Sequence, residues 1–228
     1  MSRFRKLIAS ILTFLLGGSA ARMQARCFYH FPEDCNPTRI TDRDICDFHK
    51  VDSDLYRGSH PKCSGYVKLA ELGVRTIVNL QGAAGRDLRD CESKLPGIAF
   101  RFHVVSVNID YLEIGLTGVP DEKLRRLFAE IQRAPKPLFV NCKFGKDRTG
   151  AVVALYRMRR HEMTFSQAER EAHYYRLTPR VIGLTRTLNR YRNPRELAAL
   201  PPPVISSEGP RGVCRPKLLE DFGSERHD

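Results

Sequence analysis

The chain has 228 residues, of which 42% are hydrophobic and 28% are charged, and its formal net charge is +12. This length is enough to bury one substantial core, so a single domain of roughly 150 residues fits the chain. The positive charge favours acidic partners such as anionic membrane surfaces or phosphorylated molecules, but nucleic acid is not expected, because lysine and arginine are spread along the sequence without a nucleic-acid-binding motif.

The first 25 residues differ from the rest. Arg3, Arg5 and Lys6 precede an apolar run over residues 7–16, and small residues follow at 17–21. This layout predicts a signal peptide, and therefore an exported protein that is periplasmic or secreted. An uncleaved membrane anchor is the alternative, because the apolar stretch lengthens when it is counted through Ala21. Residues 26–44 are then an N-terminal extension.

Seven cysteines bear on this expectation. Six could pair in an oxidising compartment and leave Cys142 as a thiol, and Cys27, Cys35 and Cys46 form a cluster that could take part. The alternative is that most are small unpaired thiols. The sequence does not define the pairing.

Strands and helices are predicted to alternate from residue 45 onward. Residues 54–59 and 75–80 have the pattern of strands, and residues 62–72, closed by Gly73, have that of a helix. A helix over 86–95 and a strand over 100–107 follow.

The next predicted helix, 120–133, carries a buried stripe. Leu124, Leu127, Phe128 and Ile131 recur at helical spacing. A short apolar strand at 137–140 follows it, and further helices are predicted at 149–163, 166–176 and 179–191. This order predicts an α/β domain over 45–192, with a mostly parallel sheet flanked by helices on both faces. Residues 193–228, rich in proline and serine, are predicted to be a disordered tail.

Residues 141–150, Asn-Cys-Lys-Phe-Gly-Lys-Asp-Arg-Thr-Gly, lie between the apolar strand and the helix at 149–163. At a helix N-terminus, unpaired backbone N–H groups and the positive end of the dipole can hold an anion. The same field and the nearby cations favour the thiolate form of Cys142. Arg148 offers a planar fork for two phosphate oxygens, and Thr149 can donate its hydroxyl to the sulfur.

This string resembles the Cys-x5-Arg signature of the protein tyrosine and dual-specificity phosphatases, in a form similar to that of bacterial and phosphoinositide-cleaving members. Residues 47–61 and 73–80 also resemble the N-terminal half of bacterial dual-specificity-like phosphatases. The resemblance covers about residues 45–192 and implies the phosphatase fold, with the phosphate-binding loop between the central strand and a helix. The implied phosphate-binding residues are those of the loop: Lys143, Phe144, Gly145, Lys146, Asp147, Arg148 and Thr149. A side chain of Asp147 that pointed inward would repel phosphate, so it is expected to turn outward and brace the loop.

One residue departs from the family pattern. The position before the nucleophile is usually His in this family, but here it is Asn141, which carries no titratable charge. This leaves open whether the protein is an active phosphatase or a weakly active or inactive phosphate-binding module.

The family also uses an aspartate about thirty residues before the cysteine as acid and base. Asp110 has this spacing and follows the predicted strand at 100–107, so it is the candidate. Glu113 shares its loop. Asp121 instead opens the helix at 120–133, where an acidic residue in the first turn is common.

The predicted function is therefore phosphomonoester hydrolysis through a cysteinyl-phosphate, with Cys142, Arg148 and Asp110 as catalytic residues. Phosphotyrosine or phosphoprotein substrates are favoured, with phosphoinositides or inositol phosphates as the alternative that Lys143 and Lys146 would suit. A sulfur-transfer or arsenate-reducing enzyme with a similar loop is a further alternative. No cofactor or metal is expected, and the spacing of His49, His60 and His103 matches no common zinc pattern.

Overall fold

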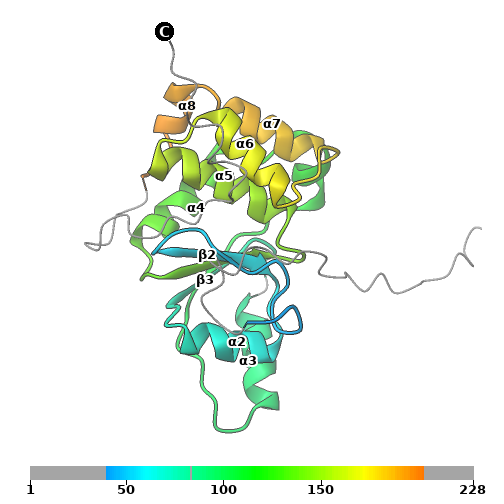
Figure 1. Cartoon of the computed structure of the whole chain (residues 1–228), viewed down its shortest axis with the longest axis vertical. Coiled ribbons are helices and arrows are strands. Elements are labelled where there is room, and N and C mark those ends of the chain that lie inside the picture. The colour runs from blue at the N-terminus through cyan, green and yellow to red at the C-terminus, as the bar shows by residue number, and fades with distance from the viewer. Residues whose placement is uncertain (1–39, 83, 203–228) are drawn as a thin grey trace, which may run out of the picture.

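A computed structural model describes residues 40–82 and 84–202 of the chain. A five-stranded sheet lies between two layers of helices, which confirms the predicted α/β fold (Figure 1). The predicted signal segment at 1–25 and most of the extension at 26–44 lie outside the described residues. In the described part of the chain, no helix has both the length and the apolar character needed to cross a bilayer.

The sheet has the strand order β1-β2-β5-β3-β4. Four strands are parallel, and the short β1 pairs antiparallel with β2 at one edge, so the sheet is mostly parallel as predicted. Because parallel strands end at the same edge of a sheet, the carboxyl ends of β2 and β5 lie together, with Ser59 opposite Cys142. The strands are β1 (His49–Lys50), β2 (Leu55–Ser59), β3 (Thr76–Asn79), β4 (His103–Ser106) and β5 (Leu138–Cys142).

Helices cover both faces of this sheet (Figure 1). One face carries α2 (Cys63–Glu71) and α3 (Ala84–Lys94), and the other carries α4 (Asp121–Arg133), α5 (Asp147–His161), α6 (Phe165–Tyr174), α7 (Ile182–Arg190) and α8 (Pro194–Ala198). Alternate strand residues supply the two cores: Ile77 and Phe139 pack on the side of α2, and Val78 and Val140 pack on the side of α5. Helix α5 is buried along most of its length, which fixes the position of the loop that precedes it.

The elements predicted in the middle of the chain are present, with ends that differ from the predicted ones by at most three residues. A short π-helical segment, η2 (Glu113–Thr117), was not predicted and follows Asp110 in the stretch expected to be a loop. It packs against α7 so closely that a Cβ on Gly183 would stand 1.9 Å from the carbonyl oxygen of Glu113.

The predicted ends of the domain need correction. At the start, Ile40 is already buried, and Asp44 accepts bonds from Thr41 and Lys68, so the fold begins before residue 45. At the end, the tail expected from residue 193 begins with helix α8, and Leu200 is fully buried. Here Asn193 caps the helix by accepting from the amide of Arg195, so the proline that follows it marks a helix start rather than disorder.

A disulfide between Cys63 and Cys91 joins α2 to α3. Cys46 is also disulfide-bonded. Cys142 is the free cysteine among residues 40–82 and 84–202, which agrees with the expectation for this thiol.

Candidate active site

The candidate site is the loop between the central strand β5 and helix α5. Cys142 is the last residue of β5 and is 4% exposed. Helix α5 begins at Asp147, so the backbone between them turns within four residues. Main-chain amides of this turn and of the first helical turn are therefore available to an anion at this point.

The loop is seated on the end of β2. Gly145 has a φ of +70°, and a Cβ at this position would lie 2.5 Å from the carbonyl carbon of Gly58 and 2.6 Å from the nitrogen of Ser59. Only glycine meets both requirements, the left-handed backbone and the close approach. The amide of His60 also donates to the carbonyl of Lys143, at 3.4 Å.

Arg148 lies one helical residue after Asp147 and is 7% exposed. In the part of the chain that the structure describes, its Nε has no hydrogen-bond partner. Its guanidinium carbon is 5.2 Å from the centroid of the Tyr111 ring, a cation–π contact. A buried guanidinium with an unused donor, at the start of a helix, is suited to an oxyanion.

Asn141 directly precedes Cys142 in β5, and Thr149 directly follows Arg148 in α5. Both residues are fully buried. Both polar atoms of the Asn141 side chain, and the hydroxyl of Thr149, lack a hydrogen-bond partner within the described ranges. Asn141 therefore supplies no charge to the cysteine next to it. The buried hydroxyl of Thr149 is available as a donor.

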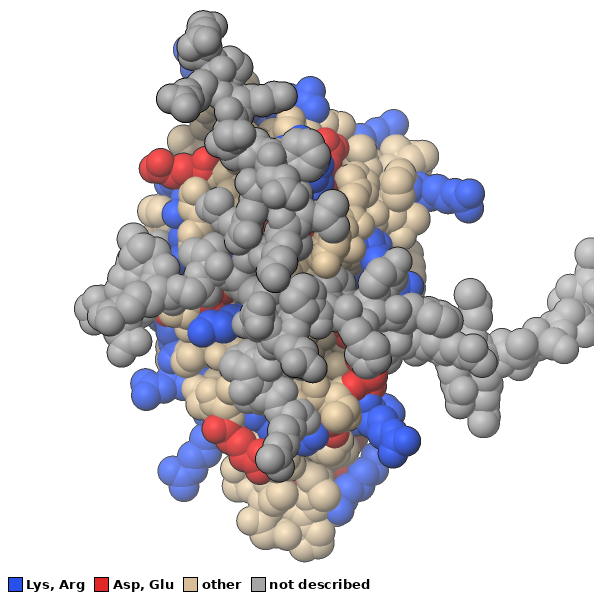
Figure 2. Space-filling model, in the orientation of Figure 1, with Lys and Arg blue, Asp and Glu red and all other residues tan. Residues whose placement is uncertain are grey.

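Two lysines of the loop lie around an aromatic residue. The Nζ atoms of Lys143 and Lys146 are 5.1 Å and 5.8 Å from the ring centroid of Phe144, which is 42% exposed. Both cations therefore stay close to the loop rather than extending away from it. Figure 2 shows lysine and arginine side chains around the margin of the molecule, with fewer acidic ones on the visible face.

Asp147 is turned away from the loop. Its Oδ1 accepts from the backbone amide of Thr178 at 2.8 Å. This is the outward, bracing orientation expected from the sequence, and it keeps the carboxylate away from the groups that could bind phosphate. Only its main-chain amide stays available for that purpose.

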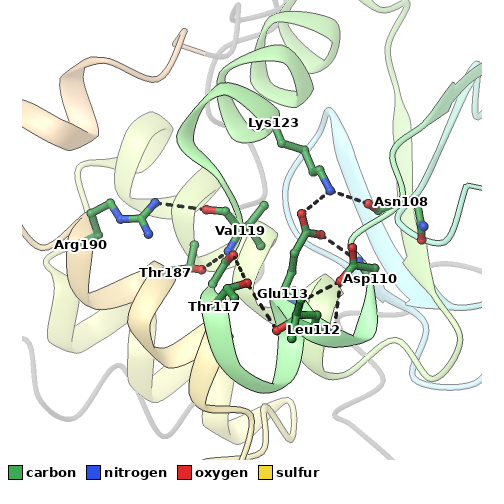
Figure 3. Close-up of polar contacts among 10 residues, drawn as sticks. Asn108, Asp110, Leu112, Glu113, Thr117, Val119, Lys123, Thr187 and Arg190 are labelled. Atoms are coloured by element: carbon green, nitrogen blue, oxygen red, sulfur yellow. Dashed lines mark hydrogen bonds and ion pairs between the residues drawn. The ribbon is translucent and has the colours of Figure 1, made fainter.

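Asp110 caps the segment that leads into η2 (Figure 3). Its Oδ1 accepts from the amides of Leu112 and Glu113, both at 2.9 Å, and Glu113 in return accepts from the Asp110 amide at 2.8 Å. The next residue is Tyr111, which contacts Arg148. The structure thus brings the Asp110 segment to the Arg148 side of the loop.

Glu113 is buried rather than lying on a surface loop. It forms an ion pair with Lys123 of α4, and Lys123 also donates to the carbonyl of Asn108 at 2.9 Å (Figure 3). This pair holds the Asp110 segment against α4. Both carboxylate oxygens of Glu113 therefore have structural partners, Oε1 with Lys123 and Oε2 with the amide of Asp110.

Asp121 begins α4, as predicted, and does not belong to the loop. It accepts from Arg190 and, at 2.9 Å, from the hydroxyl of Tyr191. Burial opposes ionisation here, but these two donors outweigh it, and the pKa of Asp121 is lowered.

Arg57 was not among the predicted site residues. It lies in the middle of β2 and donates from Nη2 to the carbonyl of Gly145 at 2.9 Å. The sequence signal that could have identified it is an arginine within the buried strand pattern Leu-Tyr-Arg-Gly-Ser, because a charge in a buried strand needs a partner.

A family model described as a DSP-PTPase phosphatase fused to NAD+ kinase matches residues 36–181. This range contains the loop, Asp110 and Arg57.

Solved structures share the fold. TpbA of P. aeruginosa is 18% identical, with a TM-score of 0.56, and the alignment covers 72% of this chain and 94% of TpbA. A cysteine-to-serine variant of TpbA in complex with pTyr is 19% identical, with a TM-score of 0.50 and coverage of 68% and 96%. A mouse protein described as a candidate dual specificity phosphatase, complexed with zinc tungstate, is 19% identical, with a TM-score of 0.50 and coverage of 68% and 91%.

Proposed function

The chain belongs to the dual-specificity phosphatase family, within the protein tyrosine phosphatase superfamily, and from this premise we propose that it hydrolyses phosphomonoesters through a cysteinyl-phosphate on Cys142. One observation carries the proposal. The buried free thiol of Cys142 and the buried guanidinium of Arg148 stand at the two ends of one loop, at the N-terminus of α5.

In the first step, the thiolate of Cys142 attacks phosphorus and the bond to the leaving oxygen breaks. Arg148 and the loop amides stabilise the charge that spreads over the three other oxygens. Asp110 gives its proton to the leaving oxygen, so the alcohol or phenol departs neutral.

In the second step, Asp110 takes a proton from water, which attacks the phosphorus of the intermediate. The sulfur–phosphorus bond breaks, inorganic phosphate leaves and the thiolate returns, with Thr149 donating to the sulfur. In the structure the carboxylate of Asp110 accepts two amides through Oδ1. Oδ2 is the oxygen we assign to proton transfer.

Phosphotyrosine is the substrate class that we favour. Tyr111 is 78% exposed and contacts Arg148, while Phe144 lies in the loop itself and is 42% exposed. Two exposed aromatic rings beside a phosphate site suit an aromatic leaving group. Among proteins with this fold, a TpbA variant has been crystallised with pTyr.

Inositol phosphates or phosphoinositides are the second candidate. Lys143 and Lys146 stay near the Phe144 ring and add two positive charges beside the loop. A substrate with several phosphates would gain most from these charges.

The test is a comparison of purified protein on a phosphotyrosine peptide, a phosphoinositide and an inositol polyphosphate, with Cys142→Ser as the matched control. We expect the highest kcat/KM on the phosphotyrosine peptide and no hydrolysis by the variant. Equal hydrolysis by both proteins would overturn the mechanism. Phosphate binding without hydrolysis by either protein would identify an inactive phosphate-binding module.

We also propose that the protein is exported or anchored at a membrane by its first 25 residues. The Cys63–Cys91 disulfide and the disulfide-bonded state of Cys46 support an oxidising compartment. Cell fractionation, with alkylation of thiols before and after reduction, tests this. Recovery of the protein from the cytoplasm with all its cysteines reduced would contradict it.

A further inference from the structure

Arg57 occupies an unusual position for an arginine. It lies in the middle of β2, between the edge strand β1 and the central strand β5, and is 1% exposed. Its register partner is Val140, two residues before Cys142. The guanidinium therefore enters the molecule close to the point where β5 turns into the phosphate-binding loop.

The guanidinium reaches the underside of this loop. Its Nη2 donates to the carbonyl of Gly145 at 2.9 Å, and the same nitrogen is 3.9 Å from the place where a Cβ on Gly150 would stand. Gly145 is in the turn and Gly150 is in the first turns of α5. One buried cation thus lies beneath the loop, from its turn to the helix that follows.

The hydrogen bond to Gly145 has a consequence for the loop. A peptide carbonyl held inward, toward Arg57, leaves the N–H of Lys146 in the same trans peptide pointing the opposite way, because the two groups are antiparallel within the peptide plane. The positive φ of Gly145 and the close approach of its backbone to Gly58 of β2 restrain the same part of the loop. Arg57 therefore helps to keep the loop in one conformation.

The other donors of Arg57 are not used in the same way. Within residues 40–82 and 84–202, its Nε and Nη1 have no hydrogen-bond partner, and the face of the guanidinium stacks on Tyr175, with the guanidinium carbon 4.3 Å from the ring centroid. A buried cation in this state is costly unless negative charge lies near it. An apolar residue would avoid this cost, so stability alone does not explain an arginine at this position.

The charged groups around Arg57 come from several elements. Burial lowers the pKa of Arg57, and Tyr175, Glu171, Asp47 and Cys142 oppose this effect. Glu171 is already paired with Arg157 at 3.0 Å. Burial raises the pKa of Asp47, against the opposing influence of Arg176, Lys146 and Arg57.

His49 does not add a second cation here. Burial, with a smaller contribution from Arg57, lowers the pKa of His49 well below its usual value, so the ring is neutral at pH 7. Asn141 is neutral as well. Among the described residues on the buried side of the loop, Arg57 is a cation that interacts electrostatically with Cys142, while Arg148 and Lys146 belong to the loop and its helix.

We propose that Arg57 is a positioning residue of this site, which holds the phosphate-binding loop through Gly145 and supplies the buried positive charge for the Cys142 thiolate that Asn141 does not. The role rests on the proposed function, since it concerns the same cysteine and loop. It accounts for how the thiolate is supported where the family usually has histidine.

The test uses Arg57→Met and Arg57→Lys in the full chain, with Arg160→Met as the control. Arg160 is also a buried arginine, but it binds Asp52 and Asp54 at the far end of α5, about 18 Å along the helix from Arg148. Two measurements need no turnover: the pH dependence of Cys142 alkylation by iodoacetamide, followed on its own peptide by mass spectrometry, and the affinity for tungstate. They separate failure of this proposal from failure of the proposed function.

For Arg57→Met, we expect the pH of half-maximal alkylation to rise by about one unit and tungstate affinity to fall at least tenfold. Arg57→Lys keeps a cation but not the fork, so it should retain most of the alkylation profile and lose tungstate affinity. Arg160→Met should lower only the unfolding temperature. If both Arg57 variants behave as this control does, or if Arg57→Met fails to fold while Arg57→Lys matches the wild type in both measurements, the proposal is overturned.

Discussion

Tyr111 lies against Arg148, with the guanidinium carbon 5.2 Å from the centre of its ring. The two residues are 37 positions apart in the sequence, and their contact joins the segment that carries Asp110 to the one that begins at Cys142. It is the observation that places the candidate acid beside the phosphate-binding loop. The contact also puts an exposed aromatic ring beside Arg148.

The role of Asp110 can be tested by a substitution that keeps its structural contacts. In Asp110→Asn, the amide oxygen can still accept from Leu112 and Glu113, so η2 should stay in place. The proton donor is lost, and we expect kcat on phosphotyrosine to fall by about 10² to 10⁴. An unchanged kcat in a folded Asp110→Asn variant would exclude Asp110 as the acid.

The exposed aromatic ring of Tyr111 predicts selectivity for aromatic substrates. Tyr111→Ala should raise KM for a phosphotyrosine peptide about fivefold, since an aromatic contact contributes about 1 kcal/mol, and should leave KM for an inositol polyphosphate unchanged. Leu112→Ala is the control, because Leu112 is exposed on the same segment but is not aromatic. Equal effects of Tyr111→Ala on both substrates would contradict an aromatic binding role.

Gly145 should tolerate no side chain. In Gly145→Ala, the new Cβ would meet the backbone of β2 at 2.5 Å, and the loop must shift. A displacement of about 1 Å should lower kcat/KM roughly 100-fold. Gly73→Ala is the matched control, since Gly73 also has a positive φ, +78°, but a Cβ there meets nothing within 4 Å. That variant should keep full activity and lose only about 1 kcal/mol of stability. Similar kinetics for the two variants would show that the close contact between Gly145 and β2 is not needed for activity.

Acid should weaken a buried cluster far from the loop. Asp52 accepts from Tyr156 at 2.9 Å and contacts His161 at 2.8 Å and Arg160 at 3.2 Å. Burial alone would raise the pKa of Asp52, but contacts led by His161 outweigh it and lower the pKa from the usual 3.8. A lowered folded-state pKa means that the stabilisation is complete at neutral pH and is lost as the pH falls below about 3.8.

The corresponding variant is Asp52→Asn, with the exposed Asp90→Asn as control. At pH 7, Asp52→Asn should lower the free energy of unfolding by about 3–5 kcal/mol, because it leaves Arg160 with one carboxylate fewer in a buried site. Urea unfolding should show this difference shrinking at pH 3. A difference that is the same at both pH values would mean that the charge of Asp52 is not what stabilises the cluster.

The sequence predicted those features that depend on local pattern. The stripe of Leu124, Leu127, Phe128 and Ile131 identified α4, and the string from Asn141 to Gly150 identified the turn between β5 and α5. Each of these depends on neighbouring residues alone. The family resemblance was confirmed by the match to residues 36–181.

Features that depend on distant contacts were missed. Arg57 is 88 residues from its partner Gly145, and nothing around it indicates which loop it will meet. Glu113 was expected only to share the loop of Asp110, but it begins η2 and is buried, where it pairs with Lys123 of α4. At the tail, Pro194 was counted as a sign of disorder, although a proline that directly follows an N-cap residue such as Asn193 is also a helix start.

The most direct test of the central claim is acid quenching of the protein during turnover of a phosphotyrosine peptide, followed by mass spectrometry of the peptide that contains residue 142. Thr149→Ala, which lacks the buried hydroxyl that would assist release of the sulfur, should accumulate the intermediate. We predict phosphate on Cys142 in this variant and none in Cys142→Ser. Turnover of substrate with no phosphate on Cys142, or with phosphate on another residue, would contradict the account.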